Sequence, residues 1–264
     1  MNVDELVNRF PAGDFPDPEK KAYLILLDLV SKSGDFDYLE IGSYLGGSLA
    51  PFLTSPQCKT VISIDKRGQN QADERGMKYD YRSITESDMI ESLHKNNIDT
   101  SKLQCFNGDI NDYQFAPDLK IKIALIDGEH TDYACFRDFV YLQNQLHQDS
   151  ILVFDDSNLV FKSIRNVKTL LESQAVDFSV LRFKETRFVV FLFGSYINEL
   201  KSNDLIDLDL ETFFAKSEDE LFKFNTYNRI SLRDYVNIAG NRYFVLRIAI
   251  ALKKIFNLIF KHKN

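Results

Sequence analysis

Residues Phe178–Phe193 read FSVLRFKETRFVVFLF, which is two runs of Phe, Val and Leu around the short segment Lys184–Arg187. Aromatic and β-branched runs of this kind are typical of strands. A connection of this length is too short for the crossover that joins two parallel strands. The stretch therefore predicts an antiparallel hairpin between Phe178–Phe183 and Phe188–Phe193.

Ahead of this hairpin, short apolar runs alternate with amphipathic stretches. We expect strands at Tyr38–Ile41, Thr60–Asp65, Leu103–Phe106, Ile121–Asp127 and Ile151–Asp155. Helical spacing separates them, with Asp17 as the N-cap of a first helix, a capping box at Thr85–Asp88, and further helices at Tyr133–His147 and Ser163–Gln174. Lys66–Asp80 is polar and without periodicity, so we expect a long surface loop there. Such alternation predicts an α/β fold whose parallel strands are joined by right-handed crossovers.

Composition narrows the class of protein. The 264 residues are 44% hydrophobic and 27% charged, as expected for one α/β domain with additional segments. A net charge of −7 argues against a nucleic-acid partner. The three cysteines show no CxxC spacing, which excludes a zinc knuckle and a disulfide framework. Met1–Phe10 is polar and no apolar run is long enough to span a bilayer, so we expect a cytoplasmic protein.

The chain is expected to have three parts. Residues 1–34 would form an N-terminal helical cap, residues 35–194 the main domain, and residues 195–264 a helical extension. Within the extension, Arg242–Lys263 mixes apolar and basic residues and predicts a helix that should not be freely exposed. Packing on the domain or on a second copy of the chain is favoured slightly. The alternative is peripheral contact with the anionic inner surface of a membrane.

A glycine-rich turn follows the first expected strand, in the segment Glu40-Ile-Gly-Ser-Tyr-Leu-Gly-Gly-Ser48. Ligands of open α/β sheets bind beyond the carboxyl ends of the strands. Gly42 and Gly46 would allow a close approach of the backbone to a ligand, although such a turn can also serve the strand–helix connection alone. The second glycine needed by the pyrophosphate of a dinucleotide is missing, which counts against NAD and for S-adenosylmethionine.

A carboxylate ends the second expected strand, at Asp65 in Ser63-Ile-Asp65. An acidic residue about 20 residues after a glycine turn commonly binds two ribose hydroxyls. The turn and Asp65 together therefore predict a cofactor that contains a ribose.

Four motifs together resemble the successive motifs of class I methyltransferases, namely Leu39–Ser48, Ile64-Asp65, Asn107-Gly-Asp109 and Leu125-Ile-Asp-Gly-Glu-His130. The fourth is most similar to small-molecule O-methyltransferases, including the macrocin-type sugar methyltransferases and the cephalosporin-hydroxylase-like group. The resemblance covers about Asp35–Gly194. It implies a Rossmann-like, three-layer α/β/α fold whose mostly parallel sheet is closed by the antiparallel C-terminal hairpin.

The same resemblance implies positions for S-adenosylmethionine. Asp65 would bind the ribose and Asp109 would lie near the adenine, although a solvated turn carboxylate is an equal alternative for Asp109. The remaining cofactor-binding residues would line the methionine and ribose portion: Glu40, Gly42, Ser43, Gly46, Ser48 and Asp127.

Three carboxylates end two neighbouring expected strands, at Asp127, Asp155 and Asp156. If unpaired, they would repel one another strongly, and a divalent cation such as Mg²⁺ is the usual remedy. The resemblance implies that such a metal holds two vicinal oxygens of the substrate and lowers the pKa of its hydroxyl. Alternatively, these residues cap a helix and brace a turn. Related catechol-type enzymes have Asp-Asn here, whereas Asp155-Asp156 precedes Ser157-Asn158, which leaves the third ligand undetermined.

His130 follows Asp127 by three positions and is the candidate general base, with Asp127 in the same catalytic loop. It could equally cap the next helix or brace Asp127. The leading hypothesis is a metal-assisted O-methyltransferase that uses S-adenosylmethionine and Mg²⁺ to methylate a hydroxyl of a sugar or other small polyol. The alternative is a methyltransferase-fold binding or scaffold protein without turnover.

Overall fold

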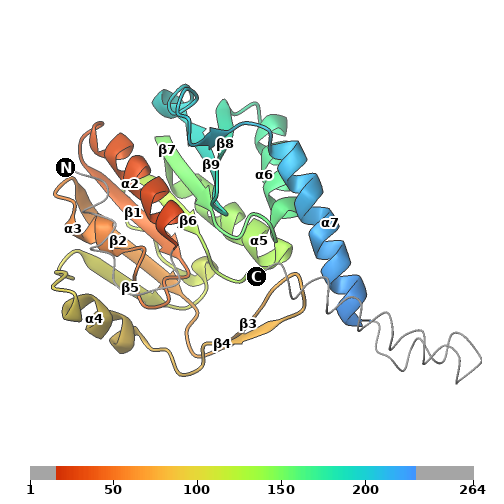
Figure 1. Ribbon diagram of the computed structural model, residues 1–264. Coiled ribbons are helices and arrows are strands. Elements are labelled where there is room, and N and C mark those ends of the chain that lie inside the picture. The colour runs from red at the N-terminus through yellow and green to blue at the C-terminus, as the bar shows by residue number, and fades with distance from the viewer. Residues whose placement is uncertain (1–15, 230–264) are drawn as a thin grey trace, which may run out of the picture. The chain divides into compact units, whose positions relative to one another are not determined.

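The computed structural model describes residues 16–229 (Figure 1). The chain divides into two compact units, residues 1–218 and 219–264. The helix expected at Arg242–Lys263 and the polar segment Met1–Phe10 lie outside the described residues. Of the helices in the described part, none is long and apolar enough to cross a membrane.

A sheet of eight strands forms the centre of the first unit, in the order β10-β8-β9-β7-β6-β1-β2-β5. The five strands from β7 to β5 are parallel, whereas β9 runs antiparallel to β7 and to β8. This arrangement confirms the α/β class and the C-terminal hairpin. The strands are β1 Phe36–Ile41, β2 Cys58–Asp65, β5 Leu103–Asn107, β6 Ile121–Ile126, β7 Leu146–Phe154, β8 Phe178–Phe183, β9 Val189–Phe193 and β10 Ile206–Asp207.

Helices cover both faces of this sheet (Figure 1). One face packs against α2, α3 and α4 in a single apolar cluster, and the other carries α5 and α6, with Phe139 of α5 against Phe154 of β7. Three layers result, as expected for alternating strands and helices. The helices are α2 Asp17–Ser31, α3 Ala50–Thr54, α4 Glu86–Lys95, α5 Asp132–Leu142, α6 Phe161–Ser173 and α7 Leu210–Arg229, and α7 crosses the boundary between the two units.

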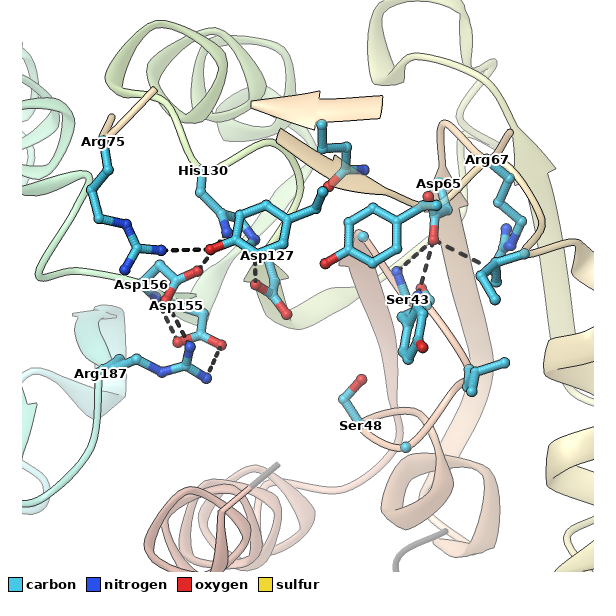
Figure 2. Close-up of a pocket in the computed structure, with 18 residues that line it drawn as sticks. Ser43, Ser48, Asp65, Arg67, Arg75, Asp127, His130, Asp155, Asp156 and Arg187 are labelled. Carbon is cyan, nitrogen blue, oxygen red and sulfur yellow. Dashed lines mark hydrogen bonds and ion pairs between the residues drawn. The ribbon is translucent and has the colours of Figure 1, made fainter. Parts of the chain in front are cut away.

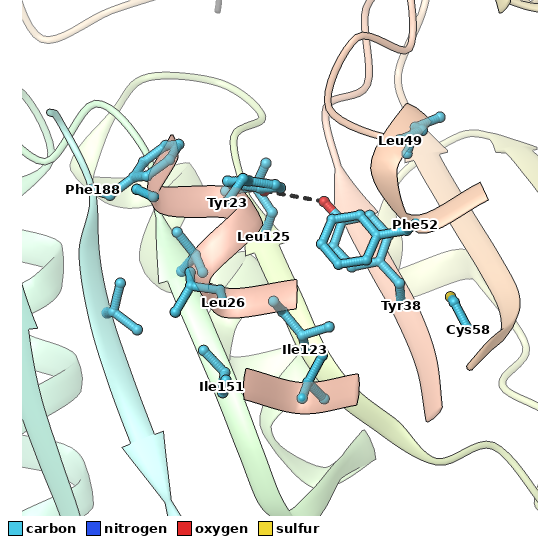
Figure 3. Close-up of a cluster of buried hydrophobic side chains, with 14 of the residues drawn as sticks. Tyr23, Leu26, Tyr38, Leu49, Phe52, Cys58, Ile123, Leu125, Ile151 and Phe188 are labelled. Carbon is cyan, nitrogen blue, oxygen red and sulfur yellow. Dashed lines mark hydrogen bonds between the residues drawn. The ribbon is translucent and has the colours of Figure 1, made fainter. Parts of the chain in front are cut away.

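Aromatic residues pack α2 against the sheet (Figure 3). Tyr38 of β1 stacks on Phe52 of α3 with ring centroids 3.7 Å apart, and Tyr23 of α2 meets Phe52 edge-on. Because a buried phenol must find a hydrogen-bond partner, the hydroxyls of Tyr23 and Tyr38 pair at 3.1 Å and Tyr38 donates to Glu40 at 2.5 Å. The core therefore contains a short polar chain that ends beneath the turn after β1.

Three local predictions can be compared with the structure. Asp17 is the first helical residue, and Pro16 takes the N-cap position without a side-chain cap, so that prediction was wrong. The capping box of Thr85 and Asp88 is confirmed. The helix expected to continue to His147 ends at Leu142, because Leu146 leaves it to pair with Ile121 and begins β7.

The segment Lys66–Asp80 is not an irregular loop. Two short antiparallel strands, β3 Asn70–Ala72 and β4 Lys78–Asp80, form a hairpin that lies apart from the large sheet (Figure 1). Asp73 holds its turn by accepting hydrogen bonds from the backbone amides of Arg75 and Met77. Strands this short and exposed show no apolar alternation, so periodicity could not reveal them.

Candidate active site

A cleft of about 240 Å³ opens at the carboxyl ends of β1, β2, β6 and β7, beneath the β3–β4 hairpin (Figure 2). Because β6 and β7 follow β1 in the sheet, the residues after these strands converge as the sequence predicted. The lining comprises Gly42, Ser43, Tyr44, Leu45, Gly47, Ser48, Asp65, Arg67, Gln71, Arg75, Tyr79, Tyr81, Ile84, Asp127, His130, Asp155, Asp156 and Arg187.

Asp65 ties the glycine-rich turn to the end of β2. Its Oδ2 accepts hydrogen bonds from the backbone amides of Ser43 and Tyr44, both at 3.0 Å, and lies 3.6 Å from the guanidinium of Arg67. The side chain is almost fully buried at the wall of the cleft. Asp65 therefore shapes the turn as well as facing the cavity.

The two predicted glycines serve different contacts. Both have positive φ, +87° at Gly42 and +79° at Gly46, a region that side chains disfavour. A Cβ on Gly42 would lie 2.0 Å from the carbonyl oxygen of Asp127, so this glycine allows the turn to pack on the end of β6. Gly46 faces Met89 of α4 and is not among the lining residues, whereas its neighbour Gly47 is.

Glu40 lies behind the turn and does not line the cleft. Its side chain is fully buried, with Tyr38 donating to Oε2 and Ser48 donating to Oε1 at 2.6 Å. Burial raises the pKa of Glu40 to about 7, and the hydrogen bonds from Ser48 and Tyr38 only partly offset that effect. The Glu40 carboxyl group thus fixes the Ser48 side chain by a hydrogen bond, and Ser48 lines the cleft.

A smaller cavity of about 60 Å³ adjoins the cleft and shares Gly42, Asp65 and Gln71 with it. Asp109 lines this cavity and also caps the 3₁₀ turn Ile110–Asp112 by accepting from the amide of Asn111. Its Oδ2 lies 3.1 Å from Arg137 and 3.5 Å from Lys66. Asp109 is thus a turn carboxylate that also lines this cavity, and its place near the adenine stays a prediction.

His130 lies between two carboxylates (Figure 2). Its Nδ1 is 2.8 Å from Oδ2 of Asp156, and its Nε2 is 3.7 Å from Oδ1 of Asp127. Burial opposes the charged imidazole, but the hydrogen bond to Asp156 and the charges of Asp156 and Asp155 outweigh it, so the pKa of His130 is raised. Burial and the neighbouring charges of Asp155 and Asp156 raise the pKa of Asp127 well above its ordinary value.

Asp127, His130 and Asp156 are the described residues whose ligand atoms lie together, within 4.8 Å of one another. The sequence assigned Asp127, Asp155 and Asp156 to this role, whereas the group in the structure has His130 in place of Asp155. Carboxylate and imidazole groups are the chemistry a divalent cation accepts. Asp156 already has two charged or hydrogen-bonding partners in the structure, His130 and Arg187, with which such a cation would compete.

Arg187 lines the cleft, as do Arg75 and Tyr79, and sequence reasoning missed all three. The guanidinium of Arg187 contacts Asp156 Oδ1 at 2.7 Å, Asp155 Oδ2 at 3.3 Å and Glu19 Oε1 of α2 at 3.0 Å. Asp155 and Asp156 are therefore paired with a cation, whereas the sequence suggested that they repel one another unpaired. A signal existed, because Arg187 precedes β9, and β9 pairs with β7 so that Val189 lies opposite Phe154, directly before Asp155.

Comparison with known proteins gives two results. Residues 39–157 match the family model described as "Methyltransferase domain". Among solved structures, the O-methyltransferase NovP is similar with a TM-score of 0.54 at 12% identity, covering 72% of this chain and 88% of NovP. CalS11, described as a calicheamicin methyltransferase, has a TM-score of 0.50 at 13% identity, covering 73% and 90% respectively. No curated protein matches the chain.

At these identities the similarity to solved structures concerns the fold, and the sheet with its antiparallel C-terminal strands is that of class I methyltransferases. The family match falls on the segment that contains the glycine-rich turn, Asp65, His130 and both carboxylates after β7. Residues 39–157 thus match a methyltransferase domain, and the sheet that contains them has the class I methyltransferase fold.

Proposed function

We propose that this protein transfers the methyl group of S-adenosylmethionine to a hydroxyl of a small molecule, a sugar or another polyol. The observation that carries the proposal is the hydrogen-bonded pair of His130 and Asp156 in the same cleft as the glycine-rich turn and Asp65. An imidazole oriented by a carboxylate is suited to removing the proton of a hydroxyl.

The two adjoining cavities support a division of the cofactor. The smaller one, with Asp109 and Arg137, would take the adenine, and the larger one the methionine portion, with Asp65 at the ribose between them. A carboxylate at that point suits two ribose hydroxyls. Gly42, Ser43, Ser48 and Asp127 stay in the proposed lining, while Glu40 and Gly46 would support the turn from behind.

The sulfonium of the bound cofactor supplies an electrophilic methyl group, and the residues of the chain supply position and a base. Because Nδ1–H of His130 donates to Asp156, Nε2 carries the lone pair that accepts the hydroxyl proton. The raised pKa makes His130 a stronger base than an unperturbed imidazole. Holding the acceptor oxygen in line with the methyl group would provide most of the remaining rate.

The cleft also supports a small acceptor. Tyr44 and Tyr81 meet edge-on at 5.5 Å, and Tyr79 stacks near Tyr81 at 6.2 Å, so aromatic faces of the hairpin line one wall. CalS11 is described as a calicheamicin methyltransferase, which agrees with a small-molecule acceptor. Asp127, His130 and Asp156 are the described group that could hold the expected Mg²⁺, but the methyl transfer proposed here does not depend on that ion.

Two measurements test the proposal. Calorimetric titration with S-adenosylhomocysteine should give micromolar binding that Asp65→Ala weakens. Transfer of a radioactive methyl group from S-adenosylmethionine to a panel of sugars and polyols should label at least one of them, with His130→Asn as the inactive control. Binding without transfer to any hydroxyl compound would favour a scaffold, and no binding at all would remove the cofactor site.

A further inference from the structure

We infer that Arg187 is a built-in counter-cation of this site, standing where a divalent metal ion would otherwise balance the carboxylates, so that methyl transfer needs no metal. The inference rests on the proposed function, because it concerns how the same cleft prepares its base. It is carried by the contacts of Arg187 with three buried carboxylates from two elements of the fold.

Arg187 provides a positive charge where the carboxylates are shielded from water. Glu19, Asp155 and Asp156 are 2%, 4% and 6% exposed, and each lies within 3.3 Å of a guanidinium nitrogen. A buried carboxylate without an ionic or hydrogen-bonding partner is strongly unfavourable. One positive charge, shared with Glu19, is therefore already present in the chain beside Asp155 and Asp156.

The oxygen atoms of the two aspartates after β7 are already engaged. Asp156 accepts from Arg187 at Oδ1 and from His130 at Oδ2, and Asp155 accepts from the backbone amide of Asp156 at Oδ1 and from Arg187 at Oδ2. A divalent cation takes several oxygen ligands at short distance. An ion that used Asp155 or Asp156 would have to compete with Arg187 or with the bond that orients His130, which leaves Asp127 as the carboxylate that Arg187 does not contact. This arrangement does not fit a resident metal ion.

The backbone holds Arg187 in this place. Its amide donates to Glu19 Oε1 at 3.2 Å, and its carbonyl accepts from the amide of Ser157 at 3.1 Å and from the Ser157 hydroxyl. The residue is thus fixed to α2 on one side and to the segment after β7 on the other. Because the backbone of Arg187 is held on both sides, its guanidinium is positioned to keep its contacts with the carboxylates permanently.

Arg187 acts on the reaction through Asp156. By pairing with Oδ1, it holds the Asp156 carboxylate so that Oδ2 receives Nδ1–H of His130. Nε2 of His130 then faces the cleft with its lone pair. Arg187 is on this account a positioning residue, and the base it positions is His130.

Manganese binding to the wild-type protein is the first test, because Mn²⁺ is paramagnetic and the unbound ion can be counted by electron paramagnetic resonance. With S-adenosylhomocysteine present, we expect no Mn²⁺ site tighter than millimolar, and the same affinity for S-adenosylhomocysteine with and without a chelator. A micromolar Mn²⁺ site that disappears in Asp156→Asn would overturn the inference. The failure of S-adenosylhomocysteine to bind would instead count against the proposed function, so the two results are distinguishable.

A pair of Arg187 variants is the second test. Arg187→Met keeps the aliphatic stem but removes the charge, and we expect it to bind Mn²⁺ at least tenfold more tightly than the wild type. Arg187→Lys retains the charge and should show no such gain. A purely structural role for Arg187 would not produce this difference, and equal Mn²⁺ affinity in a folded Arg187→Met would contradict the inference. If Arg187→Met does not fold, the wild-type titration alone decides.

Discussion

Nδ1 of His130 lies 2.8 Å from Oδ2 of Asp156, which joins the segment after β6 to the segment after β7. The two residues are far apart in the chain and meet only because β6 and β7 are adjacent parallel strands. A hydrogen bond from imidazole to carboxylate fixes the tautomer of the ring and its orientation. The chemistry proposed for the cleft depends on this one contact, and the first two predictions follow from it.

Replacing His130 by Asn should lower kcat by about 10²–10⁴-fold, the usual contribution of a general base. S-adenosylhomocysteine should bind with unchanged affinity, because in the proposed mechanism His130 faces the acceptor hydroxyl and not the cofactor. His94 is exposed on α4 and hydrogen-bonded to Thr100, so His94→Asn is the matched control and should keep full activity. A His130→Asn enzyme with normal kcat would assign the base to another group.

The pH dependence of kcat should report His130. The pKa of His130 is raised above 6.5, and the protonated ring cannot take the proton of the substrate hydroxyl. The rate should therefore increase as the pH rises through a midpoint above 6.5. Asp156→Asn removes the carboxylate that stabilises the charged ring, so the midpoint should move to lower pH. Stopped assays across the pH range measure both profiles, and an unmoved midpoint would separate His130 from the titration.

Asp65 makes two contributions that two variants separate. Asp65→Ala removes both the cofactor-facing charge and the acceptor of the Ser43 and Tyr44 amides, and hydrogen bonds to a charged group are worth about 1.5–3 kcal/mol. We expect S-adenosylhomocysteine to bind about 10–100-fold more weakly. Asp65→Asn keeps an oxygen acceptor for the turn, so it should hold the thermal stability of the wild type while still losing affinity. Unchanged affinity in both variants would remove Asp65 from the ribose role.

Glu40 should make folding stability depend on pH. Its pKa is about 7 in the folded protein and 4.5 when unperturbed, so the folded state binds the proton more strongly. The free energy of unfolding should therefore fall as the pH rises from 4.5 to 7, by about 1–3 kcal/mol. Glu40→Gln should remove this contribution, as seen in urea unfolding at several pH values. Glu91→Gln, at an exposed residue of α4, is the control and should reproduce the wild-type profile.

The two glycines of the turn should respond differently to alanine. Both substitutions place a side chain at positive φ, at a cost of about 1–2 kcal/mol. Gly42→Ala also puts a Cβ 2.0 Å from the backbone oxygen of Asp127, which cannot give way without moving β6. Gly46→Ala meets flexible side chains at 3.0 Å or more. We expect a clearly larger loss of melting temperature for Gly42→Ala, and equal losses would show that the turn and β6 are not tightly packed.

The sequence by itself determined the architecture. Apolar runs such as Ile121–Asp127 predict strands from residues that are neighbours in the chain. The short connection Lys184–Arg187 then requires its two strands to be antiparallel, because parallel strands need a longer crossover. The motifs after the strands likewise predicted which segments meet at one edge of the sheet. His130, Asp127, Asp65 and Asp156 all reach the cleft as that reasoning expected.

Tertiary structure alone decided the partners of these side chains. The sequence placed Glu40 at the cofactor, whereas packing of Tyr23 and Tyr38 buries it beneath the turn. It left the carboxylates after β7 unpaired, whereas the pairing of β9 with β7 brings Arg187 to Asp155 and Asp156 and also to Glu19. The apolar periodicity that predicts a strand or helix depends only on residues that are neighbours in the chain. A residue's ionic partners depend on distances of a few ångströms between strands and helices far apart in sequence, and only the folded arrangement sets those distances.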